Sequence, residues 1–369
     1  MDRYAKERLT SIISEFDFCS NVQNIQSYGN GHINDTFRVV NKEDDREKIY
    51  VLQRMNGDVF KNCEQLMYNI QRVTEHLKEK ISLQGGNPEM GTLQFLKTKD
   101  GKSYVMDENG DGWRIYPFIS ETITYNLAES PEQFKQSGYA FGNFQYLLAD
   151  FPASELYETI ENFHNTVDRF EKFKKAVEED RKDRAKEVQE EISFIIEREK
   201  DCHFFNDLLA NGEVPIRVTH NDTKLNNVLF SVVTGEAVCV IDLDTVMPGL
   251  AAYDFGDAIR FGASTGAEDE QDLSRVSCSM ELYEAYLDGF MEGCRGSLTA
   301  KEVETLPMGA KIMTLEVGMR FLTDYLEGDV YFKTHRKGHN LDRTRTQLKL
   351  VADMERKWDL MNDIVRKYR

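Results

Sequence analysis

Residues 214–246 read VPIRVTHNDTKLNNVLFSVVTGEAVCVIDLDTV, and this stretch decides how the rest of the chain is interpreted. Two short apolar runs, 227–233 and 237–243, flank a Thr234-Gly235 turn. Apolar runs joined by a glycine-containing turn are typical of a β-hairpin. The hairpin should bring polar residues that are far apart in the sequence to the same end.

The polar residues at the outer ends of this hairpin suit a divalent cation. They include His220, Asp222, Asn227, Asp242 and Asp244. Mg²⁺ takes oxygen ligands and usually completes its shell with phosphate and water. A carboxylate and a carboxamide five residues apart, with a further carboxylate returned beside them, therefore indicate phosphoryl transfer.

Length and composition set limits on the class of protein. The 369 residues suit two or three compact units, and 40% hydrophobic with 11% aromatic content is typical of a globular chain. The net charge of −18 argues against nucleic acid or an anionic membrane as a partner, because phosphate surfaces select Lys and Arg. Neither a signal peptide nor an apolar run of membrane-spanning length is recognisable, so we expect a cytoplasmic protein.

The first third of the chain is predicted to be rich in strands. Strand patterns cover 22–28, 36–40 and 49–55, and a helix with apolar residues at helical spacing follows at 61–80. Further strands are predicted at 93–97 and 103–107. A glycine-bracketed turn between the first two strands is expected to form a flap.

Helical patterns dominate beyond about residue 130. They are predicted for the following segments: 134–148, 153–170, 171–191, 192–209, 274–291 and 299–325. The charged run 171–191 alternates in sign, which favours an exposed helical face over a binding tail. A boundary near the apolar run 113–119 separates the two regions.

Several ordered blocks carry a resemblance to a known family. Besides His220-x-Asp222 with Asn227, the blocks are the following: Gly29 to Asn34, WRIYPFI (113–119), IDLDTVMPG (241–249), YDFGDAIRFGAS (253–264) and MRFLTDYLEGDVYF (319–332). Together they resemble the aminoglycoside phosphotransferase and choline kinase-like superfamily, and within it the N-acetylhexosamine 1-kinase family. The blocks span most of the chain from residue 27 to 350.

The resemblance implies an α+β, bilobal, protein-kinase-like fold. An N-terminal nucleotide-binding lobe would cover residues 1–116, with an antiparallel sheet and one main helix. A mostly helical C-terminal lobe at 117–369 would carry the catalytic loop, the metal site and a sugar pocket.

The resemblance also implies roles for residues of the opening stretch. Asp222 would face the acceptor hydroxyl as base or orienting group, and Asn227 with Asp242 would bind Mg²⁺. With an ordinary Asp pKa of about 3.9, Asp222 would orient the hydroxyl and accept its proton late. The alternative for Asp222 and Asn227 is that of ordinary turn residues. His220 is expected to support the loop, and Asp244 is a candidate for indirect support or a second metal.

The nucleotide, ATP, would be held by residues of the first third. The flap residues Gly29, Asn30 and Gly31 could bring backbone N–H groups to phosphate. Gln53 stands where protein kinases and many relatives have lysine, so we expect greater dependence on Mg²⁺ and backbone donors. Tyr116 belongs to the connection that contacts adenine, although a role in filling the core between the lobes is equally consistent with its sequence.

The sugar would be bound by His32, Phe261, Arg320 and Tyr331 in addition to Asp222. An Arg fork and a phenol are suitable donors to ring hydroxyls and an acetamido carbonyl. Phe261 could pack under the apolar face of the ring or simply belong to the core. His32 could equally be an exposed turn histidine.

These features together predict an ATP- and Mg²⁺-dependent kinase acting on the anomeric hydroxyl of N-acetylglucosamine or N-acetylgalactosamine. Two alternatives remain at the level of sequence. One is another small-molecule kinase with an amino alcohol or aminoglycoside acceptor, and the other is a non-catalytic nucleotide-binding scaffold, for which Gln53 is the support.

Overall fold

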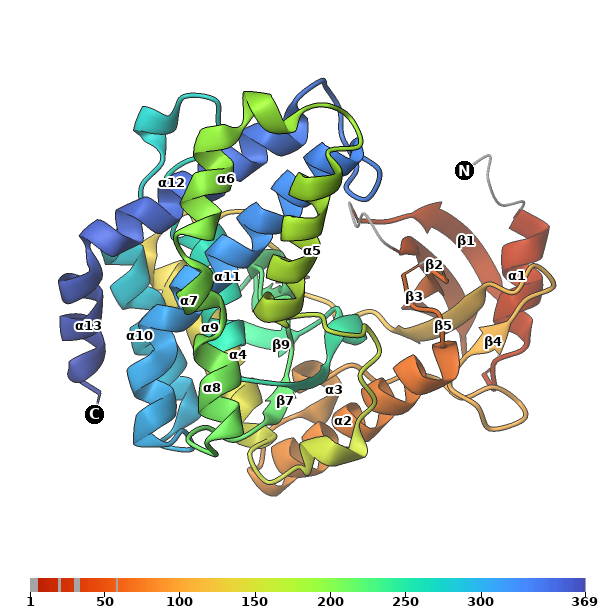
Figure 1. Cartoon of the computed structure of the whole chain (residues 1–369). Coiled ribbons are helices and arrows are strands. Elements are labelled where there is room, and N and C mark those ends of the chain that lie inside the picture. Colours follow the sequence, from red (N-terminus) through yellow and green to blue (C-terminus); the bar gives the residue numbers. More distant parts are fainter. Residues whose placement is uncertain (1–5, 19–20, 30–33, 58, 369) are drawn as a thin grey trace.

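The computed structural model describes residues 6–18, 21–29, 34–57 and 59–368. In Figure 1 an antiparallel sheet lies on the right and a mostly helical part on the left, which confirms the predicted α+β class. The boundary at residues 116 and 117 falls at the end of strand β5 (Gly112–Pro117) and stays a prediction.

The N-terminal sheet has the strand order β1–β2–β3–β5–β4. Its other strands are β1 (Val22–Ser27), β2 (Asp35–Glu43), β3 (Arg46–Met55) and β4 (Val105–Met106). The predicted strands at 22–28, 36–40 and 49–55 are thereby confirmed. The strand at 93–97 is wrong, because its backbone bonds go to separate partners: Leu96 N donates to Ile115 O, and Lys97 O accepts from Asp17 N.

The two faces of the sheet have different partners. Alternate residues such as Leu52 and Trp113 pack with helix α1 (Lys6–Ser14). The opposite face carries Gln53 and Arg114, which are paired across β3 and β5, and turns toward the helical part. Helices α2 (Cys63–Leu83) and α3 (Pro88–Gly91) extend below it in Figure 1.

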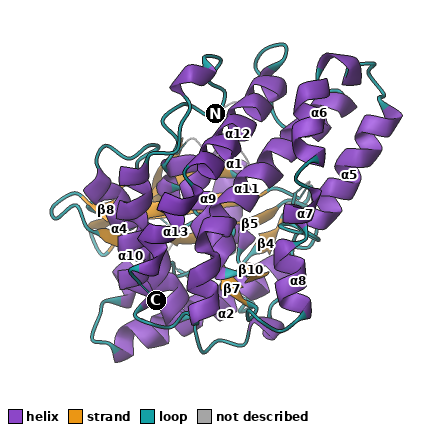
Figure 2. Ribbon diagram, turned by 60° about the vertical axis from the view of Figure 1, so that its left-hand side comes forward, coloured by secondary structure: helices purple, strands orange, loops and turns teal. Residues whose placement is uncertain are grey.

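Helices make up most of the C-terminal part (Figure 2). They are α4 (Pro131–Leu147), α5 (Thr166–Glu179), α6 (Gln189–Ile196), α7 (Glu199–Cys202), α8 (Phe204–Ala210), α9 (Ala251–Gly262), α10 (Met280–Cys294), α11 (Ala300–Glu327), α12 (His339–Arg356) and α13 (Trp358–Arg366), with short 3₁₀ turns η1 (Ala153–Glu155), η2 (Ala185–Glu187) and η5 (Leu273–Arg275). Helix α11 contacts α9, α12 and α5, and so connects the core clusters of this part. None of the helices in the described ranges is long and apolar enough to cross a membrane.

Two predicted helices are interrupted by specific residues. Instead of one helix over 153–170, the chain turns until α5, because Asn162 is left-handed (φ 54°) and Asn165 caps the new helix through Asp168 N. The charged segment 171–191 breaks after Asp180, which also has positive φ (36°). The segment 192–209 is likewise divided among α6, α7 and α8.

The predicted hairpin is confirmed. It consists of β8 (Val228–Ser231) and β9 (Ala237–Val240), joined through Gly235 with φ 75°. Strand β6 (Thr122–Ile123) pairs with β8. Strands β7 (Arg217–Thr219) and β10 (Met247–Gly249) pair beside the hairpin, and the turns η3 (Leu225–Asn227) and η4 (Leu243–Thr245) carry the polar residues.

Candidate active site

Helix α9 holds the loop that follows β7. The buried carboxylate of Asp254 accepts hydrogen bonds from the backbone N of His220 (3.0 Å) and of Asn221 (2.7 Å). Asp257 accepts from Thr223 N at 3.0 Å. Burial raises the pKa of Asp254, although these donors act in the opposite direction. The loop is therefore fixed on both sides of Asp222.

Asp222 lies in this loop between a cation and an amide. Its Oδ1 is 2.7 Å from Lys224 Nζ, and Oδ2 accepts from Asn227 Nδ2 at 3.2 Å. Its side chain is 23% exposed, so a substrate hydroxyl can reach it. Burial favours the neutral acid, but the attraction of Lys224 prevails and keeps the pKa of Asp222 below its ordinary value. The carboxylate is therefore ionised at neutral pH.

His220 connects the loop to the hairpin. Its ring is buried between Phe141 and Phe144, with Nε2 2.9 Å from Ile241 O and Nδ1 accepting from Asp222 N at 3.3 Å. Both ring nitrogens are occupied by the backbone. The geometry agrees with the supporting role expected from the sequence.

Asp242 and Asn227 lie at adjacent ends of the hairpin. Ile241 N donates to Asn227 O at 2.9 Å, and this bond places Asn227 and Asp242 at the same end of the hairpin. Asp242 has a left-handed backbone (φ 60°), and its carboxylate is solvent-accessible and has no hydrogen bond or ion pair with a described residue. Partial desolvation by the surrounding protein, with the negative charges of Asp244 and Asp222, raises the pKa of Asp242 to about 6.

This donor set fits Mg²⁺. A divalent cation would relieve the repulsion that raises the pKa of Asp242, and Asn227 Oδ1 has no partner among the described residues. The described ranges contain no group of three or more His, Cys, Asp or Glu side chains placed to hold a metal. A cation held by Asp242 and Asn227 would therefore need further oxygen ligands from nucleotide phosphate and water.

Asp244 faces the N-terminal sheet. Its Oδ1 is 2.5 Å from Arg114 Nη1, and its Oδ2 accepts from Asn34 Nδ2 at 2.6 Å. Gln53 Oε1 accepts from Arg114 Nε (3.1 Å) and Nη2 (2.9 Å). Burial opposes the charge on Arg114, but the attraction of Asp244 raises its pKa above the ordinary value. Of the two functions expected for Asp244, this arrangement supports the indirect one.

The flap and the connection between the lobes are described in part. Gly29 has φ 76°, a conformation that glycine adopts without strain, whereas Asn30, Gly31 and His32 lie outside the described residues. Tyr116 lies on the same face of β5 as Arg114, half-buried, with its ring 5.2 Å from that of Phe95. Tyr116 also packs against a buried cluster that includes Met67, Leu147 and Cys239, which come from both parts of the chain. Of the two roles considered for Tyr116, this packing supports the one between the lobes.

Arg320 and Tyr331 are brought together. The Arg320 Cζ lies 5.8 Å from the centroid of the Tyr331 ring and 5.8 Å from that of Phe163. Within the described ranges the Arg320 guanidinium has no hydrogen bond or ion pair. Asp324 holds the segment that carries Tyr331 by accepting from Tyr331 N at 2.8 Å. The two predicted sugar ligands thus lie beside each other, and their contact with sugar stays a prediction.

A second arginine lies near Arg320 and Tyr331. Arg169 Nη2 donates to Phe163 O at 3.1 Å, and its Nε is buried without a partner among the described residues. Burial and the nearby Arg320 charge lower the pKa of Arg169. The carboxylate of Glu316 is fully buried and already bound by His164 (3.0 Å) and Thr166 (2.7 Å). The Glu316 carboxylate is therefore not paired with Arg169 or Arg320, and N–H groups of both arginines have no partner among the described residues.

The surface formed by Phe163, Arg320 and Tyr331 is connected to the loop that carries Asp222. The His164 ring lies 4.4 Å from that of Phe163, and its Nε2 is 3.2 Å from Asn221 O. Phe261, in contrast, is half-buried at the end of α9, and its ring centroid is 5.9 Å from Arg260 Cζ. Its predicted contact with sugar stays a prediction.

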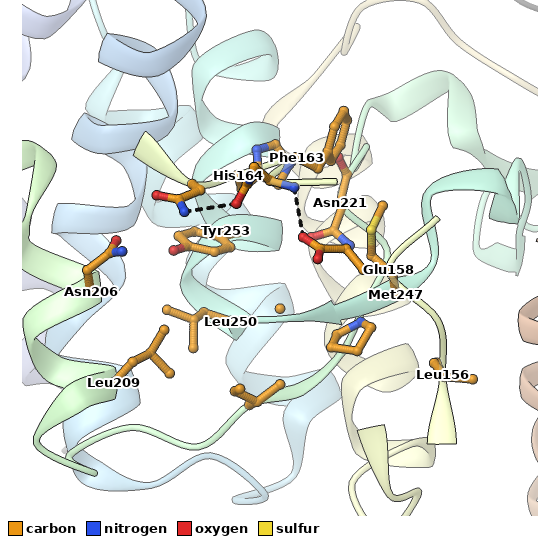
Figure 3. Close-up of a pocket in the computed structure, with 15 residues that line it drawn as sticks. Leu156, Glu158, Phe163, His164, Asn206, Leu209, Asn221, Met247, Leu250 and Tyr253 are labelled. Carbon is orange, nitrogen blue, oxygen red and sulfur yellow. Dashed lines mark hydrogen bonds between the residues drawn. The ribbon is translucent and has the colours of Figure 1, made fainter. Parts of the chain in front are cut away.

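A cavity of about 350 Å³ lies behind the loop (Figure 3). Its lining includes Phe163, His164, Asn221, Met247 and Tyr253. The side chains labelled in Figure 3 come from several elements, among them α8 (Asn206 and Leu209), β10 (Met247) and α9 (Tyr253). Neither Asp222, Asn227 nor Asp242 lines the cavity. The three residues predicted to carry the chemistry therefore lie outside the lining of this cavity.

The chain belongs to the phosphotransferase enzyme family known as APH, whose model matches residues 24–288. It is therefore a phosphotransferase by family. Among solved structures, an aminoglycoside phosphotransferase from Alicyclobacillus acidocaldarius is similar, with a TM-score of 0.63 and 12% identity over 97% of this chain and 95% of that one. A choline kinase from Cryptosporidium parvum has a TM-score of 0.56 and 14% identity over 98% of both chains.

A spectinomycin phosphotransferase in complex with ADP and spectinomycin is also similar. Its TM-score is 0.60 at 13% identity, over 95% of this chain and 99% of that one. At such low identity these structures establish the fold alone. They confirm the predicted bilobal, protein-kinase-like architecture.

Three residues of the site did not emerge from the sequence. Lys224 could have been noticed, because it lies two positions after Asp222. Arg114 is visible within the 113–119 block, but only strand register places it beside Gln53. Arg169 lies near the end of the helix predicted over 153–170, and nothing in the local pattern distinguishes it.

Proposed function

We propose that this phosphotransferase is an ATP- and Mg²⁺-dependent small-molecule kinase that phosphorylates the anomeric C1 hydroxyl of an N-acetylhexosamine. Asp222 would orient the hydroxyl and take its proton as the bond to phosphorus forms. Asn227 and Asp242 would hold Mg²⁺, which supplies charge neutralisation to the phosphoryl group when bound.

The observation that carries the choice of acceptor is the pair Arg169 and Arg320. Neither guanidinium forms an ion pair with a described carboxylate, although the buried Glu316 charge attracts both. Two cationic groups against this one carboxylate would still repel an ammonium group, so an aminoglycoside or choline would bind poorly beside them. Carbonyl and hydroxyl oxygens of a neutral sugar, in contrast, are good acceptors for Arg donors. The acetamido carbonyl of an N-acetylhexosamine suits these two arginines.

The two alternatives are less well supported by these contacts. A cationic acceptor would require free carboxylates beside these arginines, where Glu316 is already occupied. A non-catalytic scaffold was suggested by Gln53, but Arg114 places a positive charge against that side chain. The presence of Asp222, Asn227 and Asp242 also favours an active kinase over a non-catalytic scaffold.

A substrate panel tests the proposal. Initial rates would be compared for N-acetylglucosamine, N-acetylgalactosamine, glucose, choline and an aminoglycoside at one concentration of ATP and Mg²⁺. We expect the N-acetyl sugars to give the highest kcat/KM, and we expect Arg320→Ala to lower it by about 10-fold through KM. Preference for choline or the aminoglycoside would overturn the assignment of the acceptor.

A further inference from the structure

We propose that Arg114 supplies the fixed positive charge of the nucleotide site, with Gln53 as its orienting acceptor and Asp244 as its counter-ion instead of a metal ligand. The inference deepens the proposed function, since it concerns the nucleotide half of the same site. Arg114 would act as a positioning residue that holds the flap end and the metal-bearing turn around the phosphates.

The position of Arg114 follows from strand register. Gln53 in β3 and Arg114 in β5 are directly paired, and both side chains lie on the face opposite the α1 core. Gln53 Nε2 donates to Thr36 Oγ1 at 3.2 Å, which orients its Oε1 toward the guanidinium. The positive charge that a lysine would place at position 53 on β3 is thereby provided by Arg114 on the adjacent strand β5.

The state of Asp244 distinguishes it from Asp242. Asp244 is 3% exposed, and both of its oxygens are occupied, one by Arg114 and one by Asn34. A buried guanidinium needs such a partner, because an isolated charge in the interior is costly. Asp242, two residues earlier, has neither oxygen bonded to a described residue. Asp242 is therefore available to a cation and Asp244 is not.

The same contacts join the parts of the site that surround a nucleotide. Asn34 is the last residue of the flap block, and Asp244 follows the metal-binding candidate on η4. Asp244 bridges Asn34 and Arg114, because Oδ2 accepts from Asn34 and Oδ1 accepts from the Arg114 guanidinium, where the sheet meets the helical part. The charge of Arg114 would therefore favour the phosphate groups of a nucleotide bound beside Asn34 and η4, without favouring the nucleoside.

The inference is tested by moving the positive charge from position 114 on β5 to position 53 on β3. Binding of ADP and of adenosine to the full chain would be measured by calorimetry with Mg²⁺ present and no sugar. We expect Arg114→Gln to weaken ADP binding by about 10- to 100-fold and adenosine binding by less than about 2-fold. We expect the double variant Gln53→Lys with Arg114→Gln to recover most of the ADP affinity, and Arg295→Gln, on an exposed residue, to change neither.

A Mg²⁺ titration tests the role of Asp244. We expect Asp244→Asn to leave the Mg²⁺ concentration for half-maximal ADP binding within about 2-fold, and Asp242→Asn to raise it by about 10-fold or more. The inference is overturned if Asp244→Asn shifts the Mg²⁺ requirement as Asp242→Asn does. It is also overturned if Arg114→Gln weakens ADP and adenosine equally, or if the double variant recovers nothing.

Neither misfolding of a variant nor a wrong sugar assignment prevents a test of the role of Arg114. Should Arg114→Gln not fold, Arg114→Lys carries the comparison, because a charge retained on β5 must preserve ADP binding within about 10-fold if the inference holds. A failure of the sugar assignment would leave nucleotide binding intact. A failure of this inference would leave the acceptor panel intact.

Discussion

At the scale of single residues, Asp222 is the group whose change should affect chemistry most selectively. Asp222→Asn keeps the size of the side chain and removes the proton acceptor beside Lys224. We expect kcat to fall by about 10²- to 10⁴-fold, the range contributed by a positioned base. Initial rates with saturating ATP and sugar measure the effect. A variant with nearly full turnover would contradict the assigned role, and the exposed Asp359→Asn is the matched control.

Asp353 offers a residue-scale test of stability. Burial opposes its ionisation, but Lys357 Nζ at 2.8 Å and Cys278 N at 2.7 Å more than offset this and lower its pKa to about 2. A lowered pKa contributes stability above the ordinary value near pH 4 and loses it as pH falls toward 2. We expect Asp353→Asn to cost about 2 kcal/mol at pH 7 and progressively less below pH 4.

Denaturant unfolding of both proteins at pH 7 and pH 3 measures that difference. A cost that does not change with pH would contradict the account. Glu190→Gln, on an exposed helical residue, should show no such dependence.

At the scale of elements, α4 and α10 pack through small residues. Gly138 and Gly142 on α4 face Gly289 and Gly293 on α10, and a Cβ at any of them would collide with backbone of the other helix. We expect Gly289→Ala to lower the free energy of unfolding by about 2 kcal/mol or more, because the backbones must separate. Thermal unfolding measures this, with Ser193→Ala at an exposed helical site as the control. An unchanged midpoint would show that the two helices can separate at little cost.

The same scale explains what could be predicted from the sequence. The hairpin around Gly235 and the helix α11 were predictable, because a turn signal marks the first and a capping box of Thr299 and Glu302 begins the second. The helix expected over 153–170 was not, since Asn162 adopts a left-handed conformation that the apolar spacing does not reveal. Helices α12 and α13 were not predicted at all.

The candidate site shows a similar division. The loop residues Asp222 and Asn227 are local in sequence, and their spacing, the apolar strand that follows and the family resemblance identified them as candidates. The contact of Arg114 with Asp244 joins residues 130 positions apart and depends on strand register and on how the sheet meets the helical part. No local pattern contains that information.

At the scale of the whole molecule, nucleotide should stabilise both parts together, because its proposed ligands lie on the sheet and on the hairpin. We expect ADP with Mg²⁺ at about 100 times its Kd to add about 2.7 kcal/mol to the stability of the folded state and to raise Tm. Thermal unfolding with and without EDTA measures the Mg²⁺-dependent part. That part should shrink in Asp242→Asn. An equal shift with EDTA would contradict a metal at this position.

The central claim is transfer of the ATP γ-phosphoryl group to the anomeric oxygen, and the most direct measurement is phosphorus NMR of the product. Purified protein with ATP, Mg²⁺ and N-acetylglucosamine or N-acetylgalactosamine would be incubated to completion. The account predicts a sugar 1-phosphate, recognised by coupling of phosphorus to the anomeric proton and formed about 10²- to 10⁴-fold more slowly with Asp222→Asn. Phosphate on any other hydroxyl, or no sugar phosphate with either sugar, would contradict it.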